Sequence, residues 1–356
     1  MQIFITGICG FVGSSLALAF RERLPDAAIS GIDNFIRPGS ETNLARLRAA
    51  GVRVDHRDIR CESDFETLPK CDWIIDAAAN PTVLAGVDGR TSSRQLVEHN
   101  LLGTVNVLEY ARRSSAGLVL LSTSRVYGIS ALTKVPLGVT DDAFCFESAV
   151  PAPRGCSAAG ISEDFSTRAP ISLYGATKLA SESLALEYGQ TFKFPVVINR
   201  CGVLAGEGQF GVAEQGIFSF WIRAYALRRP LKYIGFDGTG HQVRDALHPD
   251  DLSDLLIRQM KQPDRSGGEI WNVGGGSHNA MSLAQLSRWC AGEFGAHEIA
   301  AAREPRPFDV PWVVMDSRRV ASTFDWQPQV ALPRILAQIA AHHRQNPDWF
   351  LLAQPR

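Results

Sequence analysis

Short runs of apolar and β-branched residues recur along the first 200 residues, and longer amphipathic stretches lie between them. The runs predict strands at 2–6, 28–32, 52–56, 73–78, 118–122 and 195–199. The stretches 92–113 and 173–193 carry apolar residues at helical spacing and predict helices. Alternating strands and helices imply right-handed crossovers between parallel strands. The pattern therefore predicts the α/β class, with a doubly wound parallel sheet.

The regular alternation stops between residues 129 and 171, where proline, glycine and serine are frequent. This stretch is too long for a plain connection, so we expect a functional loop. Beyond residue 200 the pattern is mixed, with predicted helices at 213–229 and 282–295 and a predicted strand at 270–275. We therefore expect two domains. The first comprises residues 1–199 and 240–262, and the second, smaller and mixed α/β, comprises residues 200–239 and 263–356.

Composition and charge narrow the classes of partner. The 356 residues carry a formal net charge of −1, so there is no electrostatic case for a nucleic acid or a membrane surface. No uncharged apolar stretch is long enough to span a bilayer, and no signal-peptide pattern is present. The seven cysteines are scattered, which is typical of free thiols in the cytoplasm. The histidines lack metal-ligand spacing, so no metal site is expected.

The motif TGICGFVG places Gly7, Gly10 and Gly13 directly after the first predicted strand. Glycines there allow a tight turn and close approach to a pyrophosphate, and the following helix N-terminus offers free N–H groups. Asp33 ends the second strand, where a carboxylate binds the ribose hydroxyls of a dinucleotide. Asp33 would repel a 2′-phosphate, so NAD is favoured over NADP, although Arg37 lies close by in the sequence. The sequence therefore predicts a Rossmann-type, NAD-binding sheet.

A tyrosine and a lysine stand four positions apart in the motif YGATK, at Tyr174 and Lys178. On a helix they lie on the same face. An unperturbed tyrosine has a pKa of about 10 and is a poor base at neutral pH. A neighbouring ammonium and the charge of an oxidised nicotinamide would lower that pKa, so that the phenolate can take a proton from a sugar hydroxyl. A solvated surface pair is the alternative, and the glycine motif upstream makes it the less favoured one.

The order of these motifs resembles that of the extended short-chain dehydrogenase/reductase family, over essentially the whole chain. The further matches are DIR (58–60), DAAAN (76–80), Asn100, STSRVYG (122–128), VRDALH (243–248) and WNVGG (271–275). Two residues depart from the family pattern: Asp76 replaces a usual histidine, and Ile8 replaces a usual glycine. The resemblance implies NAD contacts from Gly7, Gly10, Phe11, Val12, Gly13, Asp33, Asn34, Asp58, Ile59, Ala77, Ala78, Ala79, Asn100, Ser122, Tyr174, Lys178 and Cys201.

The stretch STSRVYG supplies a third catalytic candidate. The resemblance implies that Thr123 shares the substrate hydroxyl with Tyr174. Family members that eliminate water usually carry an Asp-Glu pair directly after this threonine, whereas Ser124 and Arg125 stand here. The general acid chemistry of an elimination is therefore missing, which favours oxidation followed by hydride return.

The second half of the chain supplies candidates for substrate binding. The resemblance implies that Arg244 and Arg306 bind a nucleotide diphosphate, with Arg303 as a nearby competitor. Forked guanidinium donors suit a diphosphate, and a surface salt-bridge pair is the alternative. The implied substrate contacts are Asn80, Thr82, Ser124, Arg125, Gln215, Arg244 and Arg306.

Within the family, the segments SETNL, GISEDF and HQVRDALH resemble those of the CDP-tyvelose (CDP-paratose) 2-epimerases. The resemblance implies an NAD-dependent epimerase that oxidises C2 of a CDP- or UDP-linked sugar and returns the hydride to the opposite face. The loop 129–171 and residues 200–210 are expected to set the pose of the sugar.

Three other functions remain open from the sequence. They are a UDP-hexose 4-epimerase, an oxidoreductase with net turnover, and a non-catalytic, cofactor-sensing protein. A homodimer through the helices 92–113 and 173–193 is implied by the family resemblance.

Overall fold

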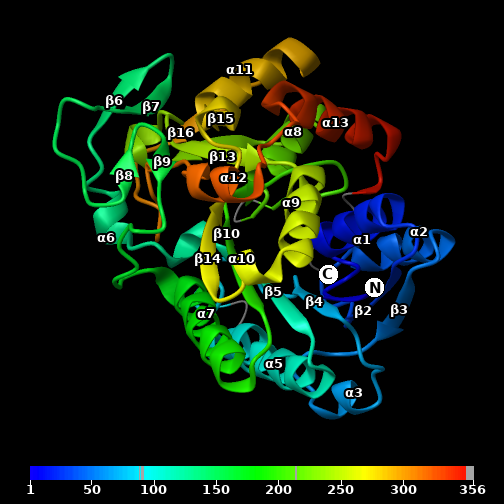
Figure 1. The fold of residues 1–356 in the computed structure, drawn as a ribbon. Helices are drawn as coiled ribbons and strands as arrows, with labels where there is room; N and C mark the ends of the chain where they lie inside the picture. Colours follow the sequence, from blue (N-terminus) through cyan, green and yellow to red (C-terminus); the bar gives the residue numbers. More distant parts are fainter. Residues whose placement is uncertain (88, 90–91, 213–214, 350–356) are drawn as a thin grey trace.

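The centre of the structure, a computed structural model that describes residues 1–87, 89, 92–212 and 215–349, is a seven-stranded parallel sheet (Figure 1). The strand order is β14-β10-β5-β4-β1-β2-β3. This order confirms the predicted α/β class and doubly wound sheet. The strands are β1 (Gln2–Thr6), β2 (Ala28–Asp33), β3 (Arg53–His56), β4 (Trp73–Asp76), β5 (Gly117–Thr123), β10 (Val196–Cys201) and β14 (Glu269–Val273).

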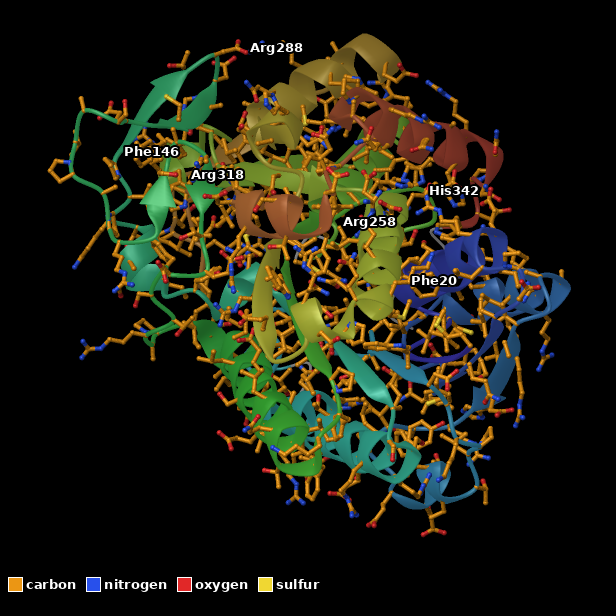
Figure 2. The ribbon with its side chains drawn as sticks, in the orientation of Figure 1. Phe20, Phe146, Arg258, Arg288, Arg318 and His342 are labelled. Carbon is orange, nitrogen blue, oxygen red and sulfur yellow. The ribbon has the colours of Figure 1, made fainter. Side chains whose placement is uncertain are left out.

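Helices cover both faces of the sheet, and alternate strand residues point toward opposite layers. In β1, Ile3 and Ile5 pack with α1 and α9, whereas Phe4 packs with α5. Phe20 of α1 belongs to the first of these layers (Figure 2). Burial on both faces explains why the strands are continuous apolar runs. One layer contains α1 (Phe11–Arg23), α2 (Asn43–Ala49), α9 (Pro249–Lys261) and α12 (Arg318–Phe324); the other contains α3 (Ser63–Glu66), α5 (Gly103–Ser114) and α7 (Ser172–Phe192).

The predicted helix 92–113 is divided in the structure. Helix α4 (Ser93–Val97) continues through a π-helical turn at Glu98–Leu102 into α5. A π-helical turn inserts a residue into the helical ladder and often occurs at functional sites. Here the turn contains Asn100, which the family resemblance assigned to cofactor binding.

Several segments of the chain after β10 build a second, smaller unit with its own apolar core, above the large sheet in Figure 1. Three helices enclose this core: α8 (Ile217–Ala226), α11 (Leu283–Phe294) and α13 (Leu332–Gln345). The strands of this unit are β11 (Val203–Leu204), β13 (Val243–Leu247), β15 (Ala280–Ser282) and β17 (Trp312–Val313) in one sheet, and β12 (Leu231–Ile234) and β16 (Ile299–Ala302) in another.

The sheets depart from the predicted domain division at two strands. β14 pairs with β10 in the large sheet, although the prediction assigned residues 263–356 to the second domain. β13 pairs with β11, β15 and β17, although the prediction assigned residues 240–262 to the first domain. The chain passes repeatedly between the two sheets, and a hydrophobic pattern does not record which sheet a strand joins.

The predicted loop 129–171 contains short elements of its own. They are α6 (Ile129–Leu132), the hairpin β6 (Leu137–Thr140) and β7 (Ala143–Phe146), and the pair β8 (Cys156–Ser157) and β9 (Gly160–Ile161). The hairpin is fastened to the second unit, because Ser282 Oγ donates to Asp142 O at 2.6 Å and Arg288 pairs with Asp141 at 2.8 Å. Figure 2 shows Arg288 at the tip of the hairpin.

A buried ion pair joins α7 to the centre of the sheet. Arg200 of β10 lies 2.7 Å from Glu182 of α7, and both side chains are almost fully buried. Ser122 of β5 donates to the same carboxylate. Arg200 also donates to the Tyr127 hydroxyl at 3.4 Å, which donates to Asn272 of β14 at 2.6 Å. This network fixes α7 against β5, β10 and β14.

Removal of one charge from this pair should destabilise the protein strongly. Glu182→Gln keeps the shape of the side chain but leaves the Arg200 guanidinium buried without a counter-ion. We expect the free energy of unfolding to fall by about 3–5 kcal/mol, measured by urea denaturation.

The matched control is Asp254→Asn, which removes an exposed partner of Arg258 in α9 at 2.9 Å. Its cost should stay below about 1 kcal/mol. Equal losses in the two variants would show that the buried pair does not hold α7 in place.

Candidate active site

A cavity of about 430 Å³ lies at the carboxyl ends of the large sheet, lined by both the sheet and the second unit. Such a position is usual for ligand sites in doubly wound sheets. The predicted site residues that line it are Gly7, Gly10, Phe11, Val12, Gly13, Asp33, Asn34, Ile59, Ala77, Ala78, Ala79, Ser122, Thr123, Ser124, Arg125, Tyr174, Cys201, Gln215, Arg244 and Arg306.

Five predicted site residues do not line this cavity: Asp58, Asn80, Thr82, Asn100 and Lys178. None of the residues 129–171 lines it either, so the expectation that this loop sets the pose of a sugar stays a prediction. The loop packs on the second unit instead. By contrast, the expected segment 200–210 reaches the cavity at several positions, from Cys201 to Phe210.

The glycine motif forms a cradle with no room for side chains. Gly7 has a φ of 62°, and its carbonyl accepts the Gly10 N–H at 2.9 Å. A Cβ on Gly13 would lie only 2.2 Å from Gly7 O, so only glycine lets α1 begin this close to β1. The unusual Ile8 is fully buried and lies over Gly31, where a Cβ would be 2.7 Å from Ile8 Cδ1. The departure from the family pattern is therefore accommodated by a second glycine.

The Asp33 carboxylate is oriented by the backbone on both sides. Cys9 N donates to Oδ2 at 2.9 Å, and Phe35 N donates to Oδ1 at 2.8 Å. Burial raises the pKa of Asp33, and these N–H groups oppose the rise. Arg37, the nearest candidate for a 2′-phosphate, donates to Phe210 O at 2.5 Å. The arrangement fits a ribose with two free hydroxyls, as NAD carries.

Asp58 and Asn100 form hydrogen bonds with nearby residues of the chain in this structure. Burial acts to raise the pKa of Asp58, but hydrogen bonds from Arg60, which lies 2.6 Å away, hold this pKa well below its usual range. Asn34 Nδ2 also donates to Asp58, at 3.0 Å. Asn100 Oδ1 accepts Asn80 N at 2.8 Å, and Asn100 Nδ2 donates to Asn80 O at 3.0 Å. Their roles toward a cofactor stay predictions.

Asp76, which stands where relatives usually have histidine, is fully buried beneath the cradle. Thr6 Oγ1 donates to Asp76 Oδ1 at 2.6 Å and accepts the N–H groups of Ala77 and Ala78, each at 3.1 Å. Burial raises the pKa of Asp76, and the nearby Lys178 ammonium opposes this rise. The Thr6–Asp76 contact thus fixes the backbone that lines the cavity after β4.

Thr123, at the end of β5, and Tyr174, in the first turn of α7, both line the cavity and are hydrogen-bonded to each other. Burial raises the pKa of Tyr174 to about 12, whereas a hydrogen bond with Thr123 and the charge of Arg125 act to lower it. The lowered pKa expected from the sequence is therefore not a property of the protein without cofactor. Burial also lowers the pKa of Lys178, which faces Asp76 and Glu182.

Three arginines that were predicted to contact the substrate line the cavity: Arg125, Arg244 and Arg306. Arg244 Nη2 donates to Val310 O at 2.8 Å and lies 3.4 Å from Asp309 Oδ1. The cavity thus brings together the predicted pair, Arg244 from β13 and Arg306 from the segment 303–311, and Arg125 lies in the same cavity.

The sequence did not single out Gln242, Phe308 or Asp309 as cavity residues, and it indicated Gln209 and Phe210 only as part of the segment 200–210. Phe210 is the clearest case, because its ring stacks on Trp349 with centroids 5.0 Å apart while its carbonyl binds Arg37. These contacts join segments far apart in the chain, so no local pattern indicates them.

Comparison with known proteins agrees with this geometry. A sequence model described as the NAD dependent epimerase/dehydratase family matches residues 3–274. The chain is 28% identical to a CDP-paratose 2-epimerase of Salmonella typhi over 340 residues, covering 93% of this chain and 96% of the relative. It is 26% identical to a dTDP-glucose 4,6-dehydratase of Streptomyces niveus, covering 98% and 95%.

A solved structure shares the fold. The UDP-glucuronic acid 4-epimerase of Bacillus cereus, solved with UDP-glucuronic acid and NAD, superimposes with a TM-score of 0.77 at 22% identity, covering 97% of this chain and 99% of that chain. Within the described part of the chain, no helix is both long and apolar enough to cross a membrane.

The Asp33 geometry predicts discrimination between cofactors. The protein should bind NAD at least about tenfold more tightly than NADP, measured by titration calorimetry, because a 2′-phosphate would meet a fixed carboxylate. Asp33→Asn should narrow this ratio. Asp55→Asn, a change on the neighbouring strand β3, should leave the ratio unchanged; equal binding of both cofactors by the native protein would refute the assignment.

Proposed function

This chain belongs to the NAD-dependent epimerase/dehydratase family, and we propose that it is an epimerase that acts at C2 of a nucleotide-linked sugar. One observation carries the proposal. A single cavity holds the glycine cradle with Asp33, the pair Thr123 and Tyr174, and the cluster of arginines. The cradle with Asp33 suits a dinucleotide, Thr123 and Tyr174 suit a reacting sugar carbon, and the arginines suit a diphosphate.

The fit to NAD rests on the cradle and on Asp33. The glycines allow close approach of a pyrophosphate, and the first turn of α1 offers N–H groups to it. Asp33 is held ready to accept hydrogen bonds from both ribose hydroxyls. When bound, NAD supplies a hydride acceptor and donor for the sugar carbon.

The residues of this chain supply the proton chemistry and the anchor. Tyr174, as phenolate, takes the proton of the sugar hydroxyl and later returns it, while Thr123 holds the same oxygen by a hydrogen bond. Arg244 and Arg306 hold the diphosphate, so the keto-sugar rotates to present its other face without leaving the cavity. NAD held in the glycine cradle would supply the hydride that returns to the opposite face of the sugar carbon.

The residues after Thr123 favour an epimerase over a dehydratase. Elimination of water needs a group that removes a carbon-bound proton and one that protonates the leaving hydroxyl. Ser124 and Arg125 line the cavity at this place, and neither is an acid at neutral pH. The assignment to C2, and to a CDP-linked substrate, is supported by the likeness to the CDP-paratose 2-epimerase.

We also propose a cytoplasmic homodimer. Val97, Leu102 and Leu173 are exposed apolar residues on the two helical stretches that the family resemblance assigned to the dimer contact. Leu102 is the most exposed of them, at 51%. All seven cysteines are free in the structure, which supports a reducing compartment.

Loss of the Tyr174 hydroxyl should abolish most activity without loss of structure. Tyr174→Phe keeps the ring, and general acid–base catalysis contributes about 10²–10⁴-fold, so turnover of the substrate should fall by that factor. The matched control is Tyr188→Phe on the same helix, whose hydroxyl binds Glu109 at 2.8 Å outside the cavity. Near-native turnover by Tyr174→Phe would refute the mechanism.

Isotopic labelling tests which carbon reacts. CDP- and UDP-sugars with deuterium at C2 should show a primary isotope effect and keep the label in the epimerised product, because the same hydride returns to the same carbon. Sugars labelled at C4 should show no primary effect. A primary effect at C4 alone would instead identify a 4-epimerase.

A further inference from the structure

Backbone contacts place Arg125 next to Thr123 and Tyr174, the two groups proposed to react with the sugar hydroxyl. The 3₁₀ turn Ser124–Val126 follows Thr123 directly, and the Arg125 N–H donates to Thr123 Oγ1 at 3.2 Å. Its carbonyl lies against Gly175, where a Cβ would be only 2.3 Å from Arg125 O. Because Gly175 follows Tyr174, this close approach fixes the turn beside the first turn of α7.

The Arg125 side chain points into the same cavity as Tyr174 and is held there. Its Nη1 donates to Phe308 O at 3.1 Å, across from the second unit. Burial, Arg244 and Arg306 lower the pKa of Arg125 to about 10, while Asp309 and Tyr174 oppose this change. Arg125 therefore stays charged at neutral pH.

The groups that act on the pKa of Tyr174 come from three elements. They are Thr123 of β5, which hydrogen-bonds to it, Arg125 of the 3₁₀ turn and Cys201 of β10. Of these, Arg125 is the cation whose charge acts to lower the pKa of Tyr174.

Lys178, the cation expected from the sequence, has anionic neighbours instead. It is almost fully buried and lies near Asp76 and Glu182. Glu182 is shared with Arg200, but Asp76 has no other cationic neighbour among those that shift its pKa. The positive charge of Lys178 is therefore partly balanced by Asp76, the carboxyl that replaces the usual histidine.

We propose that Arg125 is a positioning residue for the reaction, whose guanidinium holds Tyr174 as the phenolate that accepts the sugar proton. The proposal rests on the proposed function, because it concerns the same proton transfer. The sugar O–H bond breaks, the Tyr174 O–H bond forms, and the hydride leaves the same carbon for the bound NAD of the proposed function. A glutamate at this position, as in dehydratases, would act on the phenolate in the opposite sense.

The test is the titration of Tyr174 itself, in the NAD-bound protein and without substrate. Uniform fluorotyrosine labelling brings the phenol pKa values toward neutral pH, and ¹⁹F NMR then resolves the six tyrosines. Tyr174→Phe assigns the signal. Arg125→Gln, which can still donate to Phe308 O, should raise the pKa of Tyr174 by about one unit or more, and Arg125→Lys should raise it less.

The matched control is Arg306→Met, which removes a positive charge from the same cavity but not from beside Tyr174. It should change the pKa of Tyr174 by less than half as much as Arg125→Gln does. If Arg125→Gln fails to fold, Arg125→Met gives the same comparison, and Arg125→Lys remains a third variant. An unchanged Tyr174 pKa, or an equal rise in Arg306→Met, would overturn the proposal.

The result is independent of the proposed function. The titration uses no substrate, so a protein that proves not to be an epimerase can still show the shift. Conversely, an active epimerase whose Tyr174 pKa ignores Arg125 would overturn this inference alone.

Discussion

Helix α7 is held against the end of strand β5, and the proposed chemistry depends on that contact. The buried Glu182–Arg200 pair and the hydrogen bond from Ser122 fix the middle of the helix. The missing side chain of Gly175 lets the turn after Thr123 touch its first turn. Because both constraints act on the same helix, Tyr174 has one position relative to Thr123. The cofactor cradle is fixed separately, by glycines at the start of α1, so the two halves of the site meet through the rigid sheet.

Burial encloses the reacting groups of the proposed site, but it also makes the Tyr174 hydroxyl harder to ionise. A tyrosine in a low-dielectric cavity resists ionisation, which is why its pKa rises to about 12 in the protein alone. Positive charge near the hydroxyl must offset that effect before the tyrosine can act as a base. In this chain the nearby lysine has acidic neighbours, and Arg125 takes the place that an acid occupies in dehydratases. In the proposed function, the change from an Asp-Glu pair to Ser124 and Arg125 therefore removes the chemistry of elimination, and Arg125 supports that of oxidation.

The sequence predicted those parts of the molecule that depend on local pattern. Strands buried on both faces appear as apolar runs, and the glycine motif and YGATK each fix their geometry within a few residues. Pattern did not predict that β14 joins the large sheet and β13 the sheet of the second unit. It also did not predict the π-helical turn at Glu98–Leu102 that interrupts the predicted helix 92–113. Pattern also did not show that the loop 129–171 packs on the second unit, because the length of chain between two motifs does not say where a loop packs. Contacts such as Phe210 with Trp349 join distant segments and leave no local signal.

In the proposed function, the protein epimerises a nucleotide-linked sugar by removing and returning one hydride. The most direct measurement is turnover of CDP- and UDP-sugars in D₂O with no added cofactor, followed by mass spectrometry of the products. We expect an epimer of unchanged mass, with no carbon-bound deuterium, because the hydrogen never exchanges with solvent. A product that carries carbon-bound deuterium, or that has lost water, would contradict it, since either outcome requires removal of a carbon-bound proton.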